Sequence, residues 1–202
     1  SRRDLGLVFN HLPEAAYERG KAINRNEASI VANAVMEHAR KCPELTLGVA
    51  SFNLSQMRAI QDELELLRYK DPSCEGFFAA HPEEPFFVKN LESVQGDERD
   101  VIFISVGFGR TSQGYLAMNF GPLNQEGGER RLNVLITRAR MRCEVFSNLQ
   151  ADDIDLNRSN ARGVAALKTF LKYAASGILD VPKALGGEVE SPFEEAVYRA
   201  LT

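Results

Sequence analysis

The chain of 202 residues has few of the features that mark disulfide-bonded, metal-binding or membrane proteins. It contains three cysteines and three histidines, and neither type has the spacing of metal ligands, so we expect no disulfide and no metal site. Its longest apolar runs, such as residues 101–106, are far shorter than the roughly 20 residues that a membrane span needs. The sequence does not open on a charged and then apolar leader. We therefore expect a cytoplasmic protein without membrane contact.

Two further absences restrict the function. The net charge is −4 and the sequence pI is about 5.5, so the overall positive charge of a tight, nonspecific nucleic-acid binder is lacking. Any nucleic-acid contact must then be local. The chain also has no Gly-x4-Gly-Lys-Ser/Thr sequence, the loop and lysine that hold the β- and γ-phosphates of a nucleotide. We expect the chain to be inactive as an ATPase on its own.

What the sequence does contain is an ordinary globular composition, with 44% hydrophobic and 26% charged residues. Short apolar runs predict strands, and stretches with helical periodicity lie between them. The predicted strands are residues 5–9, 45–51, 86–88, 101–107 and 144–147, and the predicted helices are residues 26–40, 54–67, 130–140 and 161–175. This alternation favours an α/β fold, with a parallel sheet covered by helices on both faces.

The chain is predicted to hold one domain and the beginning of another. Residues 1–185 form the domain, and residues 186–202 form a linker and the first helix of a following domain. Ser191 and Glu194 have the spacing of a helix cap and its third residue, with proline between them at the first helical position. We expect the chain to be a piece of a longer protein.

The first candidate segment begins a predicted helix. Asn24 and Glu27 have the spacing of a capping box, which places Arg25 at the first helical position. The positive end of the helix dipole disfavours a cation there by about 0.3–1 kcal/mol unless an anion lies nearby. Arg25 is therefore either a solvated side chain that swings away from the helix or a contact for an anionic ligand.

The second candidate segment, residues 92–100, lies directly before the most hydrophobic predicted strand. Gly96 supplies the backbone freedom that a tight turn needs, and the polar side chains around it can reach a ligand from that turn. The alternative interpretation is a charged turn that faces solvent.

The third candidate segment, residues 127–140, is predicted to be helical. On one helix, Leu132 and Leu135 belong to the core stripe, while Arg131 and Arg138 share a flank beside it. Guanidinium groups keep their charge and present a rigid fork of donors, so this flank suits a phosphate in a neighbouring cleft. The alternative is that these arginines pair with surface carboxylates.

Taken together and in this order, the three segments resemble the C-terminal motor domain of superfamily 1 helicases, in the branch that includes the nonsense-mediated-decay helicase. Residues 95–106 are similar to motif V of that family, Gln-Gly-x-Glu followed by an aspartate and an apolar strand. Residues 131–140 are similar to motif VI, Arg-Leu-Asn-Val-(Ala/Leu)-x-Thr-Arg-Ala-Arg, and residues 24–28 to the Asn-Arg-x-Glu-Ala context of the motif IV arginine. The resemblance spans roughly residues 5–175.

Other segments carry the resemblance further. Residues 47–56 are similar to a family strand and loop that read Ile-Thr-Pro-Tyr…Gln, with Ser51 and Phe52 in place of Thr-Pro. The sequences of residues 88–100, 119–123 and 129–131 resemble those of large bacterial helicase-related proteins that carry a Vsr-like or restriction-like endonuclease domain after the motor. Residues 191–201 look like the opening helix of that domain.

The resemblance implies a RecA-like second lobe of the P-loop NTPase type. ATP with Mg²⁺ would lie between this lobe and an N-terminal RecA-like lobe of the same protein, which would supply the phosphate loop and the Mg²⁺ ligands. Arg138 would be the arginine finger, and Arg25 would be a second cation at the γ-phosphate. Gln95 and Gly96 would couple the nucleotide to the interface between the lobes, and Glu98 would bind the ribose.

The resemblance also implies a track for single-stranded nucleic acid, with Ser51, Asn53 and Ser93 as candidate contacts. Analogy with DNA-acting bacterial proteins favours DNA over RNA. The expected function is the second motor lobe of an ATP-dependent helicase or translocase. Two alternatives remain open: a catalytically silent RecA-like scaffold that docks a partner protein, or part of a nuclease that uses Glu194 or Glu195 as a metal-binding carboxylate.

Overall fold

The computed structural model describes residues 6–94 and 96–177. Three features predicted above lie outside these residues: Gln95, the expected domain end near residue 185, and the expected linker and helix of residues 186–202, with Glu194 and Glu195. Within the described residues, no helix is both long enough and apolar enough to cross a membrane.

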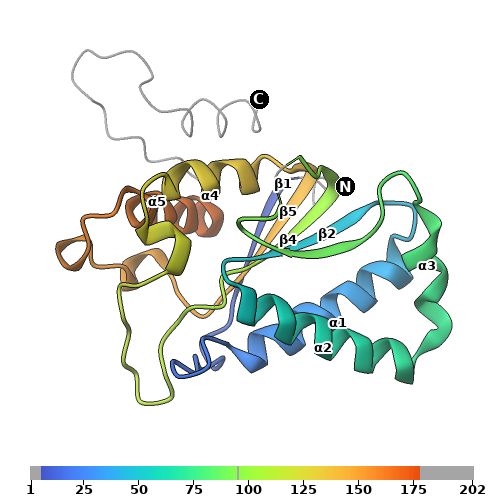
Figure 1. The fold of residues 1–202 in the computed structure, drawn as a ribbon, viewed down its shortest axis with the longest axis horizontal. Coiled ribbons are helices and arrows are strands. Elements are labelled where there is room, and N and C mark those ends of the chain that lie inside the picture. Colours follow the sequence, from blue (N-terminus) through green and yellow to red (C-terminus); the bar gives the residue numbers. More distant parts are fainter. Residues whose placement is uncertain (1–5, 95, 178–202) are drawn as a thin grey trace, which may run out of the picture.

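The described strands form one parallel sheet in the order β1-β5-β4-β2-β3 (Figure 1). Strand β4 lies at its centre, and it carries the near-continuous apolar run that the sequence analysis singled out, because a central strand is buried on both faces. The strands are β1 (Gly6–His11), β2 (Leu47–Ser51), β3 (Phe87–Asn90), β4 (Arg99–Ser105) and β5 (Ala139–Ser147).

Helices cover both faces of the sheet (Figure 1). Helices α1 (Arg25–Lys41) and α2 (Leu54–Lys70) pack on one face, with the short α3 (Glu75–Ala80) beyond them, while α4 (Gly128–Ile136) and α5 (Arg162–Ser176) pack on the other. Successive side chains of β4 enter the two layers in turn, with Val101 and Phe103 in the α1–α2 core and Ile102 and Ile104 in the α4–α5 core. The predicted α/β class with a doubly covered parallel sheet is confirmed.

One predicted helix is wrong at its carboxyl end. Helix α4 stops at Ile136, and the chain enters β5 at Ala139, so Arg138 is not helical. The Thr137 hydroxyl donates to the carbonyls of Asn133 and Val134, and the backbone N–H of Arg99 donates to the Arg138 carbonyl at 3.0 Å. Pairing with β4 thus overrides the helical periodicity of the sequence, and Arg131 and Arg138 do not share a helix flank.

The parallel arrangement gives the sheet two distinct ends, here called the amino edge and the carboxyl edge. Residues 96–98, directly before β4, and the α4–β5 junction lie at the amino edge, at the top of Figure 1. The first residues of α1 and α2 lie at the carboxyl edge, because each helix follows the end of a strand. Strand β4 has seven residues, so the edges are roughly 20 Å apart.

Candidate functional site

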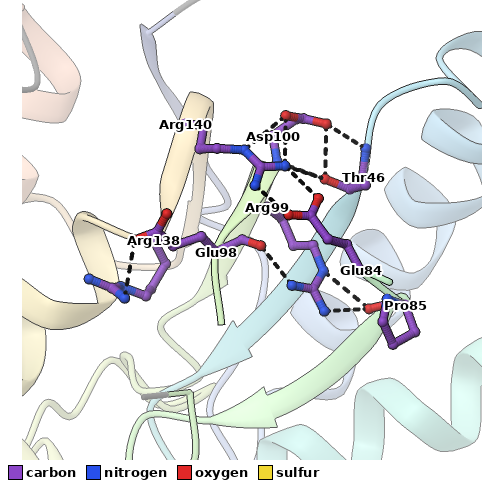
Figure 2. A network of polar contacts seen from close by, with 8 residues as sticks. All are labelled: Thr46, Glu84, Pro85, Glu98, Arg99, Asp100, Arg138 and Arg140. Atoms are coloured by element: carbon purple, nitrogen blue, oxygen red, sulfur yellow. Dashed lines mark hydrogen bonds and ion pairs between the residues drawn. The ribbon is translucent and has the colours of Figure 1, made fainter. Parts of the chain in front are cut away.

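Arg138 occupies the amino edge, where its guanidinium is only partly committed to the protein (Figure 2). Its Nε donates to the Val134 carbonyl at 3.0 Å, and one Nη donates to the Thr137 hydroxyl at 3.3 Å. The other Nη lies 3.5 Å from the Glu98 carboxylate, whose side chain is 51% exposed. A long ion pair with a half-exposed partner is weak. The geometry therefore leaves Arg138 able to exchange Glu98 for another anion.

The turn beside Arg138 has the conformation that the sequence predicts. Gly96 adopts a φ of +87°, in the left-handed region that glycine enters without strain. Val94 anchors the turn in the core, and Lys89 of β3 donates to the Asp97 carboxylate at 2.5 Å. The turn is thereby held at both sides while Gly96 and Glu98 face outward.

The neighbouring Arg140 is bound in an internal network rather than left free (Figure 2). Glu84 accepts from it at 2.5 and 2.6 Å, and Asp100 accepts from its Nε at 3.1 Å. Asp100 also accepts from the Thr46 backbone and hydroxyl at 3.0 and 2.9 Å. Burial alone would raise the pKa of Asp100, but hydrogen bonds from Thr46 and Arg140 hold it below its ordinary value. Arg140 therefore joins β5 to β4 and to the start of β2.

Arg99 is also structural. It is 6% exposed, and its guanidinium donates to the Pro85 carbonyl at 2.7 and 3.1 Å and to the Glu98 carbonyl at 2.6 Å (Figure 2). Its guanidinium carbon lies 4.9 Å from the centroid of the Phe87 ring. Arg99 thus fixes the backbone of Glu98, so the carboxylate that faces Arg138 projects from a rigid position.

The structure does not bring Arg25 to Arg138. Asn24 caps α1 as predicted, accepting from the Glu27 backbone at 3.1 Å, and Arg25 follows at the first helical position. This places Arg25 at the carboxyl edge, the other end of the sheet, where its Nε lies 2.9 Å from Glu18. The two arginines therefore extend from opposite edges, which lie roughly 20 Å apart along β4.

The three candidate nucleic-acid contacts lie together at the carboxyl edge, but they differ in access. Ser51 is fully buried, and its hydroxyl donates to the Asn53 carbonyl at 2.8 Å, so it is not accessible to a ligand. Asn53 caps α2 by accepting from the Gln56 backbone at 2.8 Å and is partly buried. Ser93 is exposed, in a turn closed by hydrogen bonds with Asn90.

Sequence reasoning missed a buried acid between these elements. Glu27 is fully buried, and its carboxylate accepts from the Ser105 hydroxyl at 2.6 Å and from the Gly107 backbone at 2.7 Å. Burial raises the pKa of Glu27 to about 7, although these hydrogen bonds oppose the change. The capping-box spacing predicts that the Glu27 side chain accepts from the Asn24 backbone N–H. That N–H donates instead to the Gln56 side chain at 2.8 Å, and Glu27 reaches across to β4.

No group of three or more histidine, cysteine, aspartate or glutamate side chains within residues 6–94 and 96–177 is arranged to hold a metal ion. The arrangement offers instead an arginine with free donors at one edge of the sheet and exposed loops at the other.

Comparison with known proteins shows which family the chain belongs to. A family model described as AAA domain (AAA_12) matches residues 5–150. The chain is 38% identical over 135 residues to an uncharacterized ATP-dependent helicase, the MG140 homolog of Mycoplasma pneumoniae, covering 63% of this chain and 11% of that protein. It is 44% identical over 90 residues to the uncharacterized ATP-dependent helicase MG140 of Mycoplasma genitalium, covering 45% of this chain and 8% of that protein. The chain thus spans about a tenth of the length of these relatives. Because the family model covers well over half of its residues, the chain belongs to the AAA_12 family of AAA domains.

Proposed function

We propose that the chain is the C-terminal motor lobe of an ATP-dependent superfamily 1 helicase or translocase, within a longer protein. The two similar proteins are both described as ATP-dependent helicases. The doubly covered parallel sheet supports a RecA-like lobe. The observation that carries the proposal is the partly free guanidinium of Arg138, paired weakly with an exposed Glu98 at the amino edge.

Arg138 acts in this proposal as an arginine finger. ATP with Mg²⁺, held by an N-terminal RecA-like lobe of the same protein, supplies the phosphoryl group and the neutralising metal charge. Arg138 leaves Glu98 and donates to the γ-phosphate oxygens, because its pair with the exposed Glu98 is long and weak while a phosphate accepts charge-assisted hydrogen bonds from both arms of the guanidinium. Glu98 then accepts from a ribose hydroxyl, while Gly96 and Gln95 couple this edge to the opposite lobe. The role of Arg25 as a second cation at the γ-phosphate stays a prediction, because Arg25 lies at the opposite edge of this lobe.

The carboxyl edge serves single-stranded nucleic acid in the same proposal. Asn53 and Ser93 remain the candidate contacts, and Arg25 joins them as a cation for a backbone phosphate. This assignment also accounts for a cation at the start of α1, since the phosphate supplies the anion that the helix dipole favours. The net charge of −4 agrees with a narrow track rather than a broad basic surface.

The test is ATP turnover by the full-length protein, with and without single-stranded DNA, for wild type and Arg138→Ala. We expect DNA-stimulated turnover that falls by at least about a hundredfold in the variant, a threshold set below the roughly 10³–10⁵ that an arginine finger can be worth. Arg130→Ala is the matched control, because Arg130 is an exposed arginine on α4, the helix that precedes Arg138. A variant that turns over ATP like wild type would overturn the role of Arg138, and a wild type without turnover would support the silent scaffold.

A different assay distinguishes the nuclease alternative from the motor function. Its candidate carboxylates, Glu194 and Glu195, belong to the expected following domain. We expect the purified chain to leave plasmid DNA intact in the presence of Mg²⁺. Nicking that is lost in Glu194→Gln or Glu195→Gln would replace the motor proposal with the nuclease.

A further inference from the structure

Two loops at the carboxyl edge bring aromatic and basic side chains together. One loop follows β1 and the other follows β4, and the Tyr17 backbone N–H joins them by donating to the Arg110 carbonyl at 2.8 Å. Tyr115 in the second loop is 48% exposed. The Arg19 guanidinium carbon in the first loop lies 5.4 Å from the centroid of the Tyr115 ring, within cation–π range.

These side chains line one small groove, together with Tyr17, Phe108 and Asn119. The ring centroids of Tyr17 and Phe108 lie 5.7 Å apart. Phe108 is buried in the hydrophobic core, so its position in the groove does not depend on a ligand.

The position of Tyr115 is also set by its backbone. The Thr111 N–H donates to the Tyr115 carbonyl at 2.9 Å, and the Tyr115 N–H donates to the Thr111 hydroxyl at 3.2 Å. Between them, Gly114 adopts a φ of +79° and completes the turn. A half-exposed aromatic ring is therefore presented on a closed turn, which lowers the conformational entropy lost when a ligand stacks on it.

The charges beside the groove favour an anionic ligand. Glu18 is already engaged, because it lies 3.2 Å from Lys21 and 2.9 Å from Arg25. In the part of the chain that the structure describes, no carboxylate pairs with Arg19. Glu14 is the exposed acid of the same loop. Arg19 can thus contribute charge to a ligand while it remains over the tyrosine ring.

We propose that Tyr115 and Arg19 form a stacking site for one nucleobase of a single-stranded nucleic acid. Every base has a flat π face that stacks on an exposed aromatic ring, and a neighbouring guanidinium adds both a stacking plane and charge for the phosphate. The inference rests on the proposed motor function, which supplies the strand, and it adds a base contact to a track otherwise built from phosphate contacts.

The absence of tryptophan allows a direct test in this chain. Tyr115→Trp introduces a single indole whose fluorescence is quenched when a base stacks on it. The probe is an oligothymidine of about 15 nucleotides, within the usual site size, at low salt. We expect quenching by this strand and none by an abasic strand of equal length. Tyr69→Trp is the matched control, because Tyr69 is 89% exposed on α2, and it should respond to neither strand.

Affinity for the oligothymidine tests the two side chains separately. We expect Tyr115→Ala to weaken binding by at least about fivefold and Tyr115→Phe to bind like wild type, since stacking needs the ring and not the hydroxyl. Arg19→Ala should also weaken binding. Equal quenching by the abasic strand, no quenching at saturating strand, or an unchanged affinity in Tyr115→Ala would each overturn the stacking site.

The stacking test requires no ATP, so it is independent of Arg138. Quenching without DNA-stimulated ATP turnover in the full-length protein would leave the stacking site in place and remove the motor function. The converse result is ATP turnover that depends on Arg138 but no quenching. It would refute the stacking site and leave the motor function in place.

Discussion

Replacing Glu27 by glutamine should change how the stability of the domain depends on pH. Glu27 is fully buried, and its folded-state pKa is about 7 against an ordinary value of 4.5. Its hydrogen bonds come from Ser105 and Gly107, at 2.6 and 2.7 Å. Glutamine has nearly the same shape and can accept both hydrogen bonds, but it cannot titrate. The substitution therefore isolates the proton of Glu27 from its packing.

The size and sign of the effect follow from the two pKa values. A carboxyl whose pKa is raised on folding contributes stability that is fully present below the unfolded pKa and is lost as pH rises through the folded pKa. For Glu27 the window is pH 4.5 to about 7. At 1.36 kcal/mol for each pKa unit, the full contribution is about 3 kcal/mol, of which about 1 kcal/mol is lost between about pH 6 and pH 8.

Urea unfolding followed by circular dichroism measures this loss. The free energy of unfolding of wild type minus that of Glu27→Gln should fall by about 1 kcal/mol from about pH 6 to pH 8. Both proteins contain the other titrating groups, so the contributions of those groups to the free energy of unfolding cancel in this difference. A difference that stays constant across this range would show that Glu27 has an ordinary pKa, and the account of its burial would be wrong.

Two other predictions concern packing and thiol reactivity. In Gly163→Ala the new Cβ would overlap the Leu123 carbonyl oxygen, so the free energy of unfolding should fall by about 1–3 kcal/mol. In Gly76→Ala the new Cβ meets no neighbour, so the free energy of unfolding should rise by about 0.5–1 kcal/mol. A destabilised Gly76→Ala, or a neutral Gly163→Ala, would contradict this. Burial raises the pKa of the Cys143 thiol to about 12, so Ellman's reagent should label Cys42 in the folded protein and Cys143 only after unfolding.

The alternation of elements was predictable because it depends on local hydrophobic patterns. Each predicted strand has a counterpart in the sheet, and the helices begin within two residues of their expected starts. The short α3 was not predicted, since its six residues carry too little periodicity. The end of α4 was predicted wrongly because residues 137–140 continue the helical pattern while their backbone pairs with β4.

The candidate site was likewise predictable in part from the sequence and in part only from the tertiary structure. The sequence alone determined the α/β class, the cap at Asn24 and the need for glycine at Gly96, because each follows from interactions between residues close in the chain. Tertiary structure decided which arginine is free, leaving Arg138 weakly paired while Arg140 is bound by Glu84, 56 residues away. It also placed Arg25 at the opposite edge from Arg138, since the direction of parallel strands sets which loops share an edge, and no local pattern records that distance.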